Sequence, residues 1–481
     1  MRNAGQGKAM DQIKAVFTRR MLLAGLAAAP AMLAAGRGWS AESEVDVVIV
    51  GAGAAGIGAA IALAGSGLKY AIVEAADRIG GRALTDSKTF LDRNGQPIAF
   101  DIGCAWIHRW EDANDPFRQW AERLKFETYD HDLAVKALFY GPDRASDAMV
   151  KQLGEDEEKI GDALTLAADQ DLDIAGNRVV VDRRPPMDAA ATYVGPMDAA
   201  VDLAHLSTFD HRALAEYGQN RLVRQGYGTL VRAVASANRL DAPGGVTSLR
   251  TPVQQIRYDR AGSPLIQVET GGARPGVITT RAVIVTCSTG VLQSGAIRFT
   301  PDLPVAHQQA IGELKMGLLA KIPLQLPGVP HDIGGIKPYD NVLDETPGDR
   351  DIYFLAWPWQ SDLMVGFVGG DFAWQLSAEG QGAAIDFATQ RLADLFGADI
   401  KQKVTKGLLT PWASNPLAYG GYAAVMPGDY RRRADLQVPV KDRVFFAGEA
   451  VAPGGMYGTC SGAYSSGMQA ARAVMKTLAP A

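Results

Sequence analysis

The feature that most constrains this chain is a glycine loop directly after an apolar strand. Residues 45–50 (VDVVIV) are largely β-branched and predict a buried strand, and the next six residues (GAGAAG) carry a GxGxxG pattern. Gly51 permits a tight turn, Gly53 lets backbone N–H groups approach a pyrophosphate, and Gly56 lets helix and strand pack closely. A helix over about residues 54–65 adds the positive end of its dipole to this anion site.

An acidic partner follows the loop at the expected distance. A second strand (YAIVEA) ends at Glu74, whose carboxylate can accept hydrogen bonds from both hydroxyls of a ribose. Ala54 and Ala55 at the helix start and Ala75 after the acid belong to the same predicted contact set. Strand, loop, helix, strand and acid in this order predict a Rossmann-type dinucleotide site, although the loop alone does not separate NAD from FAD.

The residues after Glu74 help to decide between NAD and FAD. RIGGR, Arg78–Arg82, follows closely, and with it the sequence resembles the flavin-containing amine oxidase family. The resemblance covers nearly the whole chain beyond residue 41. The segments that carry it are DIGCAWIH (101–108), RQGYGTLVRAVA, TPVQQIRYD, TPWASNPLAYGGYAAVMPG and DRVFFAGEA with YGTCSGAYSSGMQAA. The forms AWIH, TGVL and FFAGEA are closer to the polyamine oxidase and histone demethylase branch than to the monoamine oxidases.

The resemblance implies FAD as the cofactor. Gly421 takes the position where covalent members carry a flavin-linked Cys, so noncovalent binding is expected. The small residues that open the C-terminal helix would let a planar ligand approach its N-terminus, whose dipole favours negative charge on reduced flavin. Arg82 is expected at the phosphates, Val253 at the adenine and Glu449 at ribityl or ribose hydroxyls. The resemblance assigns further cofactor contacts to Gly81, Gly448 and Thr459.

The expected fold class is α/β. A Rossmann-type, glutathione-reductase-like FAD-binding domain is joined to a discontinuous, mixed α/β substrate domain, and 481 residues exceed what one hydrophobic core usually holds. The predicted segments are a signal peptide and linker (1–41), an FAD-binding domain (42–105, 223–298 and 439–481) and a substrate domain (106–222, mainly helical, and 299–438).

Lys321 is the first catalytic candidate. In MGLLAKIPLQL it is a lone cation inside an apolar strand, and burying a lysine without a reason is costly. By position it matches the family lysine that holds a water against flavin N5. A strand-edge lysine that extends its amine to solvent is the alternative, and Lys315 is a weaker candidate for the same role.

Tyr422 falls where family members place one wall of an aromatic sandwich in front of the flavin. The opposite wall aligns with Thr459, where monoamine oxidases carry Tyr, so the sandwich is expected to be half-built and to admit a longer or bulkier amine. Tyr419 and Tyr457 are the residues that could partly substitute for the missing wall. An ordinary core tyrosine is the alternative interpretation of Tyr422.

Trp106 and His108 lie where the family's chain passes the substrate side of the flavin ring. Polyamine oxidases often carry His at this place, where it could hydrogen-bond a distal nitrogen, but a structural histidine is an equal alternative. The usual following Gly is Arg109 here. A cation at the cavity mouth would repel a polycation, which argues against a polyamine substrate.

These features predict FAD-dependent oxidation of a primary or secondary amine. Hydride passes from the α-carbon to flavin N5, and the resulting imine is hydrolysed to an aldehyde or ketone plus an amine or ammonia. The acceptor is either O₂, which yields hydrogen peroxide, or a periplasmic electron carrier. Three alternatives stay open: an L-amino-acid oxidase with Arg109 at the substrate carboxylate, a desaturase or protoporphyrinogen-oxidase type, and a non-catalytic FAD-binding scaffold.

The first 40 residues predict an export signal. In FTRRMLLAGLAAAPAMLAAG, Phe17–Gly36, Arg19 and Arg20 precede a short apolar run and small residues, which indicates the bacterial twin-arginine route. A chain whose cofactor blocks lie at opposite ends binds FAD only after folding, and the twin-arginine machinery accepts folded, loaded cargo. The expected location is therefore the periplasm.

Composition excludes some classes of partner. With 48 Lys and Arg against 53 Asp and Glu, the net charge is −5, which does not favour nucleic acid. Cys104, Cys287 and Cys460 lie far apart among small residues and are predicted to be buried apolar thiols. The six histidines never pair at metal-ligand spacing, so no metal site is expected. The run 431–433 (RRR) and most acids of residues 127–209 are predicted to be solvated, and homodimerisation is left open.

Overall fold

The strand–loop–helix–strand unit predicted near the start of the chain is present. Strand β1 (Ser43–Val50) is followed by helix α3 (Ala54–Leu63) and strand β2 (Tyr70–Val73), and Glu74 comes directly after β2. β1 pairs in parallel with β2, as a Rossmann-type unit requires. A Cβ at Gly56 would lie 2.0 Å from the Gly51 carbonyl oxygen, so only glycine permits this loop to contact the helix.

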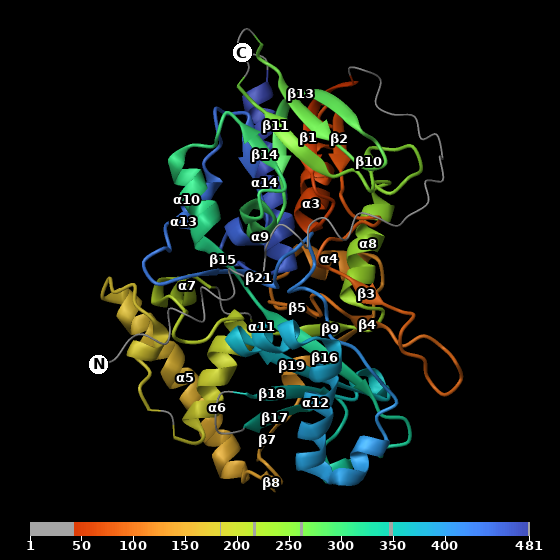
Figure 1. Ribbon diagram of the computed structural model, residues 1–481, viewed down its shortest axis with the longest axis vertical. Coiled ribbons are helices and arrows are strands. Elements are labelled where there is room, and N and C mark those ends of the chain that lie inside the picture. Colours follow the sequence, from red (N-terminus) through yellow and green to blue (C-terminus); the bar gives the residue numbers. More distant parts are fainter. Residues whose placement is uncertain (1–42, 183, 215–217, 260–262, 346–349, 480–481) are drawn as a thin grey trace. The chain divides into compact units, whose positions relative to one another are not determined.

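The computed structural model describes residues 43–182, 184–214, 218–259, 263–345 and 350–479, which all belong to the unit Gly38–Ala481 (Figure 1). The predicted leader, Phe17–Gly36, lies outside these residues. Within the described residues, no helix combines the length and apolar character needed to cross a bilayer.

The remaining elements are short to medium in length. The other strands are β3 (Thr85–Asp86), β4 (Phe100–Asp101), β5 (Trp106–Ile107), β6 (Thr128–Asp130), β7 (Lys136–Tyr140), β8 (Asp143–Arg144), β9 (Arg221–Val223), β10 (Thr247–Ser248), β11 (Val253–Arg257), β12 (Ile266–Thr270), β13 (Gly276–Val285), β14 (Arg298–Thr300), β15 (Leu314–Gly317), β16 (Leu319–Gln325), β17 (Asn341–Glu345), β18 (Ile352–Ala356), β19 (Leu363–Gly369), β20 (Lys406–Gly407), β21 (Tyr422–Val425) and β22 (Val444–Phe446). The other α-helices are α4 (Pro116–Arg123), α5 (Asp147–Asp169), α6 (Met187–Thr192), α7 (Thr208–Ala213), α8 (Tyr227–Ala237), α9 (Thr289–Gln293), α10 (Val305–Glu313), α11 (Gly370–Glu379), α12 (Gln381–Phe396), α13 (Arg432–Gln437) and α14 (Cys460–Leu478). Short 3₁₀ or π turns are η1 (His131–Leu133), η2 (Gly176–Arg178), η3 (Tyr193–Ala199), η4 (Ile333–Gly335), η5 (Pro358–Gln360), η6 (Ala398–Gln402) and η7 (Glu449–Val451).

The first sheet unites distant parts of the chain. Its order is β10-β2-β1-β13-β12-β11-β14, and β22 pairs in parallel with β13, so that Val283 lies beside Val444. β11 and β12 form the predicted antiparallel hairpin. Its strands come from the three segments assigned to FAD binding, apart from the end of β14, and the domain boundaries themselves stay a prediction.

The second sheet carries helices on both faces. Its order is β20-β16-β19-β18-β17-β7-β8. Ala388 and Leu392 of α12 pack with Ile322 and Phe354 on one face, whereas α5 and α6 pack on the other face with Leu343 and neighbouring residues (Figure 1). The alternation of side chains along each strand explains how one strand serves two cores.

Helix α14 packs directly against α3. A Cβ at Gly467 would lie 1.8 Å from the Ala55 carbonyl oxygen, and one at Gly58 would lie 2.2 Å from that of Tyr464. Gly58 belongs to α3 and Gly467 to the middle of α14, so both serve helix–helix packing. The expectation of room for a planar ligand concerned the small residues that open α14, and Cys460 and Ala463 of its first turn line a cavity.

Two arginines of the RRR run are buried, so the prediction of a surface run was wrong for them. Arg433 is 3% exposed, and its guanidinium makes two hydrogen bonds to the Asp210 carboxylate, of 2.8 and 2.9 Å. Arg432 is also buried and pairs with Glu313 and Asp435. Only Arg431 is exposed.

Candidate active site

A continuous cavity of about 800 Å³ joins the glycine loop to the second sheet. The predicted cofactor contacts that line it are Gly51, Gly53, Ala54, Ala55, Glu74, Ala75, Gly81, Arg82, Val253, Gly448, Glu449 and Thr459. The catalytic candidates Trp106, His108, Lys321 and Tyr422 line the same cavity, as does Gly421. Gly56 does not line it and lies behind the loop, against Gly51. The structure thus brings residues from every predicted block to one space.

Glu74 holds the glycine loop in place. Its Oε2 accepts a hydrogen bond from the Ala52 N–H at 2.6 Å, and its Oε1 accepts one from the Ala76 N–H at 2.7 Å. The side chain is 8% exposed, and each oxygen keeps acceptor capacity for a hydroxyl. The carboxylate therefore shapes the loop as well as facing the predicted ribose position.

Arg82 and Glu449 pair with each other across the cavity wall. Arg82 Nη1 lies 2.8 Å from Glu449 Oε1 and also donates to the Gly421 carbonyl oxygen at 2.8 Å. Glu449 accepts from the Ala423 N–H as well. The resemblance assigned Arg82 to phosphates and Glu449 to sugar hydroxyls, and the pairing shows that the two side chains also position one another.

The hydrogen-bond donors near the glycine loop fit a dinucleotide. Gly53 and Gly448 border the cavity, and a Cβ at Gly448 would meet nothing within 4 Å, so the backbone there is open to a ligand. Arg78, which also lines the cavity, donates through Nη2 to the Gly81 carbonyl, whereas its buried Nη1 has no partner among the described residues. Such an orphaned cationic donor suits a phosphate oxygen. Sequence reasoning named RIGGR but assigned no role to Arg78.

Lys321 is a buried residue of the cavity wall. It is 5% exposed, so the alternative of a strand-edge lysine reaching solvent was wrong. Its Nζ donates to the Asp101 and Gly103 carbonyl oxygens at 2.8 and 2.5 Å. Burial lowers the pKa of Lys321 to about 8, although nearby Asp101 opposes the shift. Lys315 is exposed and does not line the cavity.

Three aromatic rings surround the Lys321 amine. Phe100, Trp106 and Phe367 place their ring centres 5.9, 5.7 and 5.7 Å from Nζ. Aromatic faces stabilise a cation and exclude water, so the amine is kept in a dry, mainly apolar setting.

Asp101 links Lys321 to the second cofactor block and was not singled out from the sequence. Its carboxylate accepts from the Thr85 hydroxyl at 2.6 Å and from the Tyr227 and Gly228 N–H groups at 2.9 and 3.3 Å. It thereby caps the N-terminus of α8, while its own carbonyl oxygen receives Lys321. Burial raises the pKa of Asp101. The motif DIGCAWIH contains this residue, but its partners lie far along the chain.

Trp106 is positioned by a histidine that sequence reasoning missed. Its Nε1–H donates to His131 Nδ1 at 2.9 Å, so the neutral ring carries its proton on Nε2, which lies 3.2 Å from the Tyr339 carbonyl oxygen. Burial lowers the pKa of His131. His108 Nδ1 lies 2.6 Å from Asn220 Oδ1, and burial lowers its pKa too. Both histidines line the cavity.

Tyr422 and Thr459 have different structural roles. The Tyr422 hydroxyl donates to the Asp198 carbonyl oxygen at 2.8 Å, and Tyr422 borders the cavity. Thr459 caps α14, since its Oγ1 accepts from the Gly462 N–H at 2.9 Å and donates to the Met456 carbonyl at 2.8 Å. Neither Tyr419 nor Tyr457 lines the cavity, so the expectation that they substitute for a missing wall was wrong.

Arg109 does not line the cavity either. It is paired with Asp112 at 3.5 Å on the same turn. It therefore offers no carboxylate-binding group to the site and no cation at its lining. The argument against a polycationic substrate, which rested on Arg109, loses its basis.

Polar residues line the substrate side of the cavity among apolar ones. They are Asp132, Lys136, Tyr193, Asp198 and Asn220, none of which sequence reasoning identified. Lys136 Nζ lies 2.7 and 2.5 Å from the two Glu157 oxygens and 4.2 Å from the centre of the Tyr193 ring. Burial, together with Glu157, raises the pKa of Asp198 to about 7, while Lys136 acts in the opposite direction.

The three cysteines also line the cavity. Cys104, Cys287 and Cys460 are free and half-buried rather than fully buried as predicted. Burial raises the pKa of Cys287 to about 12, and a hydrogen bond with Cys104 together with burial raises that of Cys460. High pKa values disfavour the thiolate, so Cys287 and Cys460 behave as small apolar wall residues.

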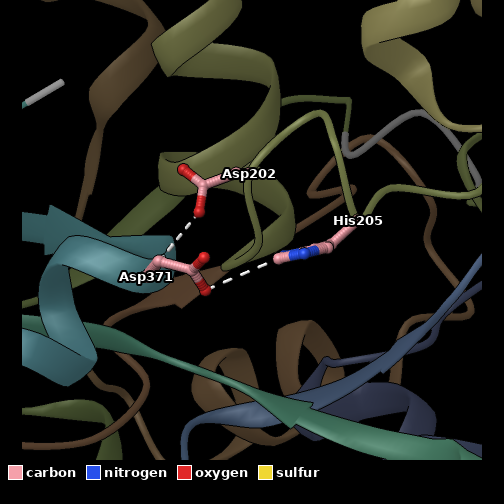
Figure 2. Close-up of side chains that lie close together, drawn as sticks. All are labelled: Asp202, His205 and Asp371. Carbon is pink, nitrogen blue, oxygen red and sulfur yellow. Dashed lines mark hydrogen bonds and ion pairs between the residues drawn. The ribbon is translucent and has the colours of Figure 1, made fainter. Parts of the chain in front are cut away.

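Asp202, His205 and Asp371 gather outside this cavity (Figure 2). Asp202 accepts from the Asp371 N–H at 2.9 Å, and His205 Nδ1 lies 3.8 Å from Asp371 Oδ1. Their potential ligand atoms lie within 4.8 Å of one another. The first contact satisfies a donor at the start of α11, and the Asp371 side chain is 73% exposed. Helix capping and a surface ion pair account for this arrangement.

Comparison with known proteins agrees with this geometry. The family described as "Flavin containing amine oxidoreductase" matches residues 54–475. Polyamine oxidase 5 from Oryza sativa subsp. japonica is 27% identical over 436 residues, covering 85% of this chain and 83% of the relative. A rice lysine-specific histone demethylase 1 homolog is 31% identical over 205 residues, 40% of this chain and 24% of that protein. Among solved structures, a redesigned putrescine oxidase superposes with a TM-score of 0.73 at 18% identity, covering 90% of this chain and all of the other.

The structural likeness confirms the predicted α/β fold class, and the family match covers more than half of the chain. The glycine cradle, the orphaned Arg78 donor and the buried Lys321 within one cavity fit the cofactor of that family. The chain therefore belongs to the flavin-containing amine oxidoreductase family and is an FAD-dependent amine oxidase.

Proposed function

We propose that this enzyme oxidises a primary or secondary amine that reacts in its unprotonated form. When bound, FAD supplies the hydride acceptor for the substrate α-carbon. The resulting imine is hydrolysed to an aldehyde or ketone plus an amine or ammonia. The residues that would hold FAD are those of the glycine loop, Glu74, Arg78, Arg82 and the first turn of α14.

The buried Lys321 carries this proposal. An ammonium has three N–H donors, and the carbonyls of Asp101 and Gly103 accept two of them. One donor is left for a water molecule or a substrate atom in the cavity. Trp106 and Phe367 keep bulk water away from this position, and the Lys321 ammonium disfavours a second cation beside it, so the substrate amine is expected to react in its neutral form.

The lining separates this function from its rivals. The arginines that line the described part of the cavity, Arg78 and Arg82, both belong to the dinucleotide end, so neither is placed to bind the carboxylate of an L-amino acid. Asp132, Lys136 and Asp198 place ionisable groups in the cavity wall, which does not suit the wide apolar cavity of a desaturase-type enzyme. Lys321 and Tyr422 face the cavity, where a non-catalytic scaffold would need neither.

Anaerobic mixing tests the proposal. The FAD-loaded enzyme is mixed with a panel of monoamines, diamines, polyamines and L-amino acids, and bleaching of the flavin absorbance is followed. We expect bleaching with amines and none with L-amino acids. Bleaching by amino acids alone, or by no compound, contradicts the proposal. Readmission of O₂, with detection of hydrogen peroxide, distinguishes an oxidase from an enzyme that uses a periplasmic electron carrier.

We further propose export by the twin-arginine route to the periplasm of a bacterium. The Arg82–Glu449 pair supports this proposal, because the cofactor cradle needs both ends of the described chain folded together. A protein of this kind gains from being loaded with FAD before export. Replacing Arg19 and Arg20 together by Lys should trap FAD-loaded enzyme in the cytoplasm, and unchanged periplasmic activity would refute the route.

A further inference from the structure

Asp198 presents an unsatisfied carboxylate to the cavity. It belongs to the π-helical turn η3, and its exposed side chain lines the cavity. Its main-chain oxygen accepts the Tyr422 hydroxyl at 2.8 Å, but no hydrogen bond or ion pair from the described residues reaches the carboxylate. A carboxylate on a cavity wall without a protein partner is available to a cationic ligand.

The backbone around Asp198 is held firmly. The Leu318 N–H donates to the Ala200 carbonyl at 3.0 Å, and the Pro196 carbonyl oxygen lies against Gly369, where a Cβ would approach it to 1.9 Å. Together with the Tyr422 hydrogen bond, these contacts fix η3 from both sides. The backbone that carries the carboxylate is therefore held in place beside Tyr422, which lowers the ordering cost of binding a ligand there.

Other charges nearby are already compensated. Lys136 is paired with Glu157 through both carboxylate oxygens. Asp132 accepts the N–H of Asn220 at 3.0 Å and its side-chain amide at 3.2 Å. Glu345, behind Tyr353, does not line the cavity, and burial raises its pKa to about 9, which keeps it neutral at pH 7. When Asp198 is ionised, its charge is the one left uncompensated among these groups.

We infer that Asp198 binds a second, non-reacting ammonium group, so that the enzyme prefers a diamine to a monoamine of the same length. The reacting nitrogen must lose its proton before oxidation, and an ion pair with a carboxylate would stabilise its protonated form. The Asp198 partner is therefore a nitrogen other than the reacting one. The single uncompensated carboxylate of Asp198 matches the single additional ammonium of a diamine. This inference rests on the proposed amine oxidation.

The test compares two substrates that differ only at the far end. A four-carbon α,ω-diamine and the five-carbon linear monoamine have similar length, but the second carries a methyl group in place of the distal ammonium. In Asp198→Asn, the diamine-to-monoamine ratio of kcat/KM should fall by roughly tenfold to a hundredfold, the range for losing a charged hydrogen bond. The loss should appear mainly in KM for the diamine, and Asp198→Glu should restore part of it.

Two controls separate binding from folding. Glu158→Gln removes an exposed acid from α5 and should keep the wild-type ratio. Anaerobic calorimetry on the dithionite-reduced holoenzyme, which cannot turn over, should show weaker diamine binding in Asp198→Asn, with an unchanged flavin spectrum and melting temperature. An equal loss for both amines, or an unchanged ratio, overturns the inference. If no amine bleaches the wild-type flavin, the proposed function fails instead.

Discussion

Arg82 and Glu449 stand 367 positions apart in the sequence and form an ion pair of 2.8 Å on the cavity wall. Arg82 follows the first glycine loop, and Glu449 precedes the C-terminal helix α14. The arginine side chain is 26% exposed and the glutamate 6%, so the pair is only partly screened by solvent. Its position between two cofactor blocks couples their geometry.

Breaking this pair should weaken FAD binding. Glu449→Gln keeps the shape of the side chain but removes the charge that holds Arg82. We expect the FAD dissociation constant to rise by about tenfold or more, since hydrogen bonds to charged groups contribute roughly 1.5–3 kcal/mol. The measurement is fluorescence titration of apoprotein with FAD. Arg184→Met, at an exposed pair with Asp182, is the matched control and should bind FAD as the wild type does.

Lys321→Met should slow flavin chemistry and spare FAD binding. The substitution removes the amine that two carbonyls hold inside the aromatic cluster. We expect flavin reduction or reoxidation to slow by about tenfold or more, a barrier increase of at least roughly 1.4 kcal/mol. Stopped-flow absorbance gives both rates separately. Lys315→Met, at an exposed lysine, should have wild-type rates, and unchanged rates for both steps in Lys321→Met would remove the role assigned to Lys321.

The lowered pKa of Lys321 has a signed effect on stability. The folded pKa is about 8 and the ordinary lysine value is 10.5, so between these pH values the unfolded chain binds the extra proton. Between pH 8 and 10.5, Lys321 should therefore make the free energy of unfolding rise with pH. Below about pH 8 the lysine is protonated in both states, so its contribution no longer changes with pH. Melting temperatures across that range should increase more for the wild type than for Lys321→Met. Parallel curves of melting temperature against pH would contradict a lowered pKa of Lys321.

The buried Asp210–Arg433 pair should be critical for stability. Arg433 also donates to the Ala450 and Ala423 carbonyls, so its loss leaves a buried carboxylate and two carbonyls without this partner. Arg433→Met is expected to lower the free energy of unfolding by about 3–5 kcal/mol. Arg431→Met, two positions earlier and exposed, should change it by less than about 0.5 kcal/mol. Denaturant unfolding of the holoenzyme provides the comparison, and equal effects would be contrary to this interpretation.

Local patterns in the sequence determined the cofactor half of this protein. GAGAAG after a β-branched strand and before Glu74 predicts its own geometry, because a tight turn and a helix start involve neighbouring residues only. Lys321 was also identifiable, since a lone cation in an apolar strand is conspicuous without any knowledge of its partners.

Only the tertiary structure decided which polar residues share a space. Arg433 belongs to a run that suggests solvent, yet Asp210, 223 positions away, makes its burial favourable. Asp198 and His131 lie in segments without a distinctive pattern, and they became site residues because η3 and η1 reach a cavity that the second sheet borders. Charge compensation and hydrogen-bond partnership depend on long-range contacts, which periodicity and motif spacing do not encode.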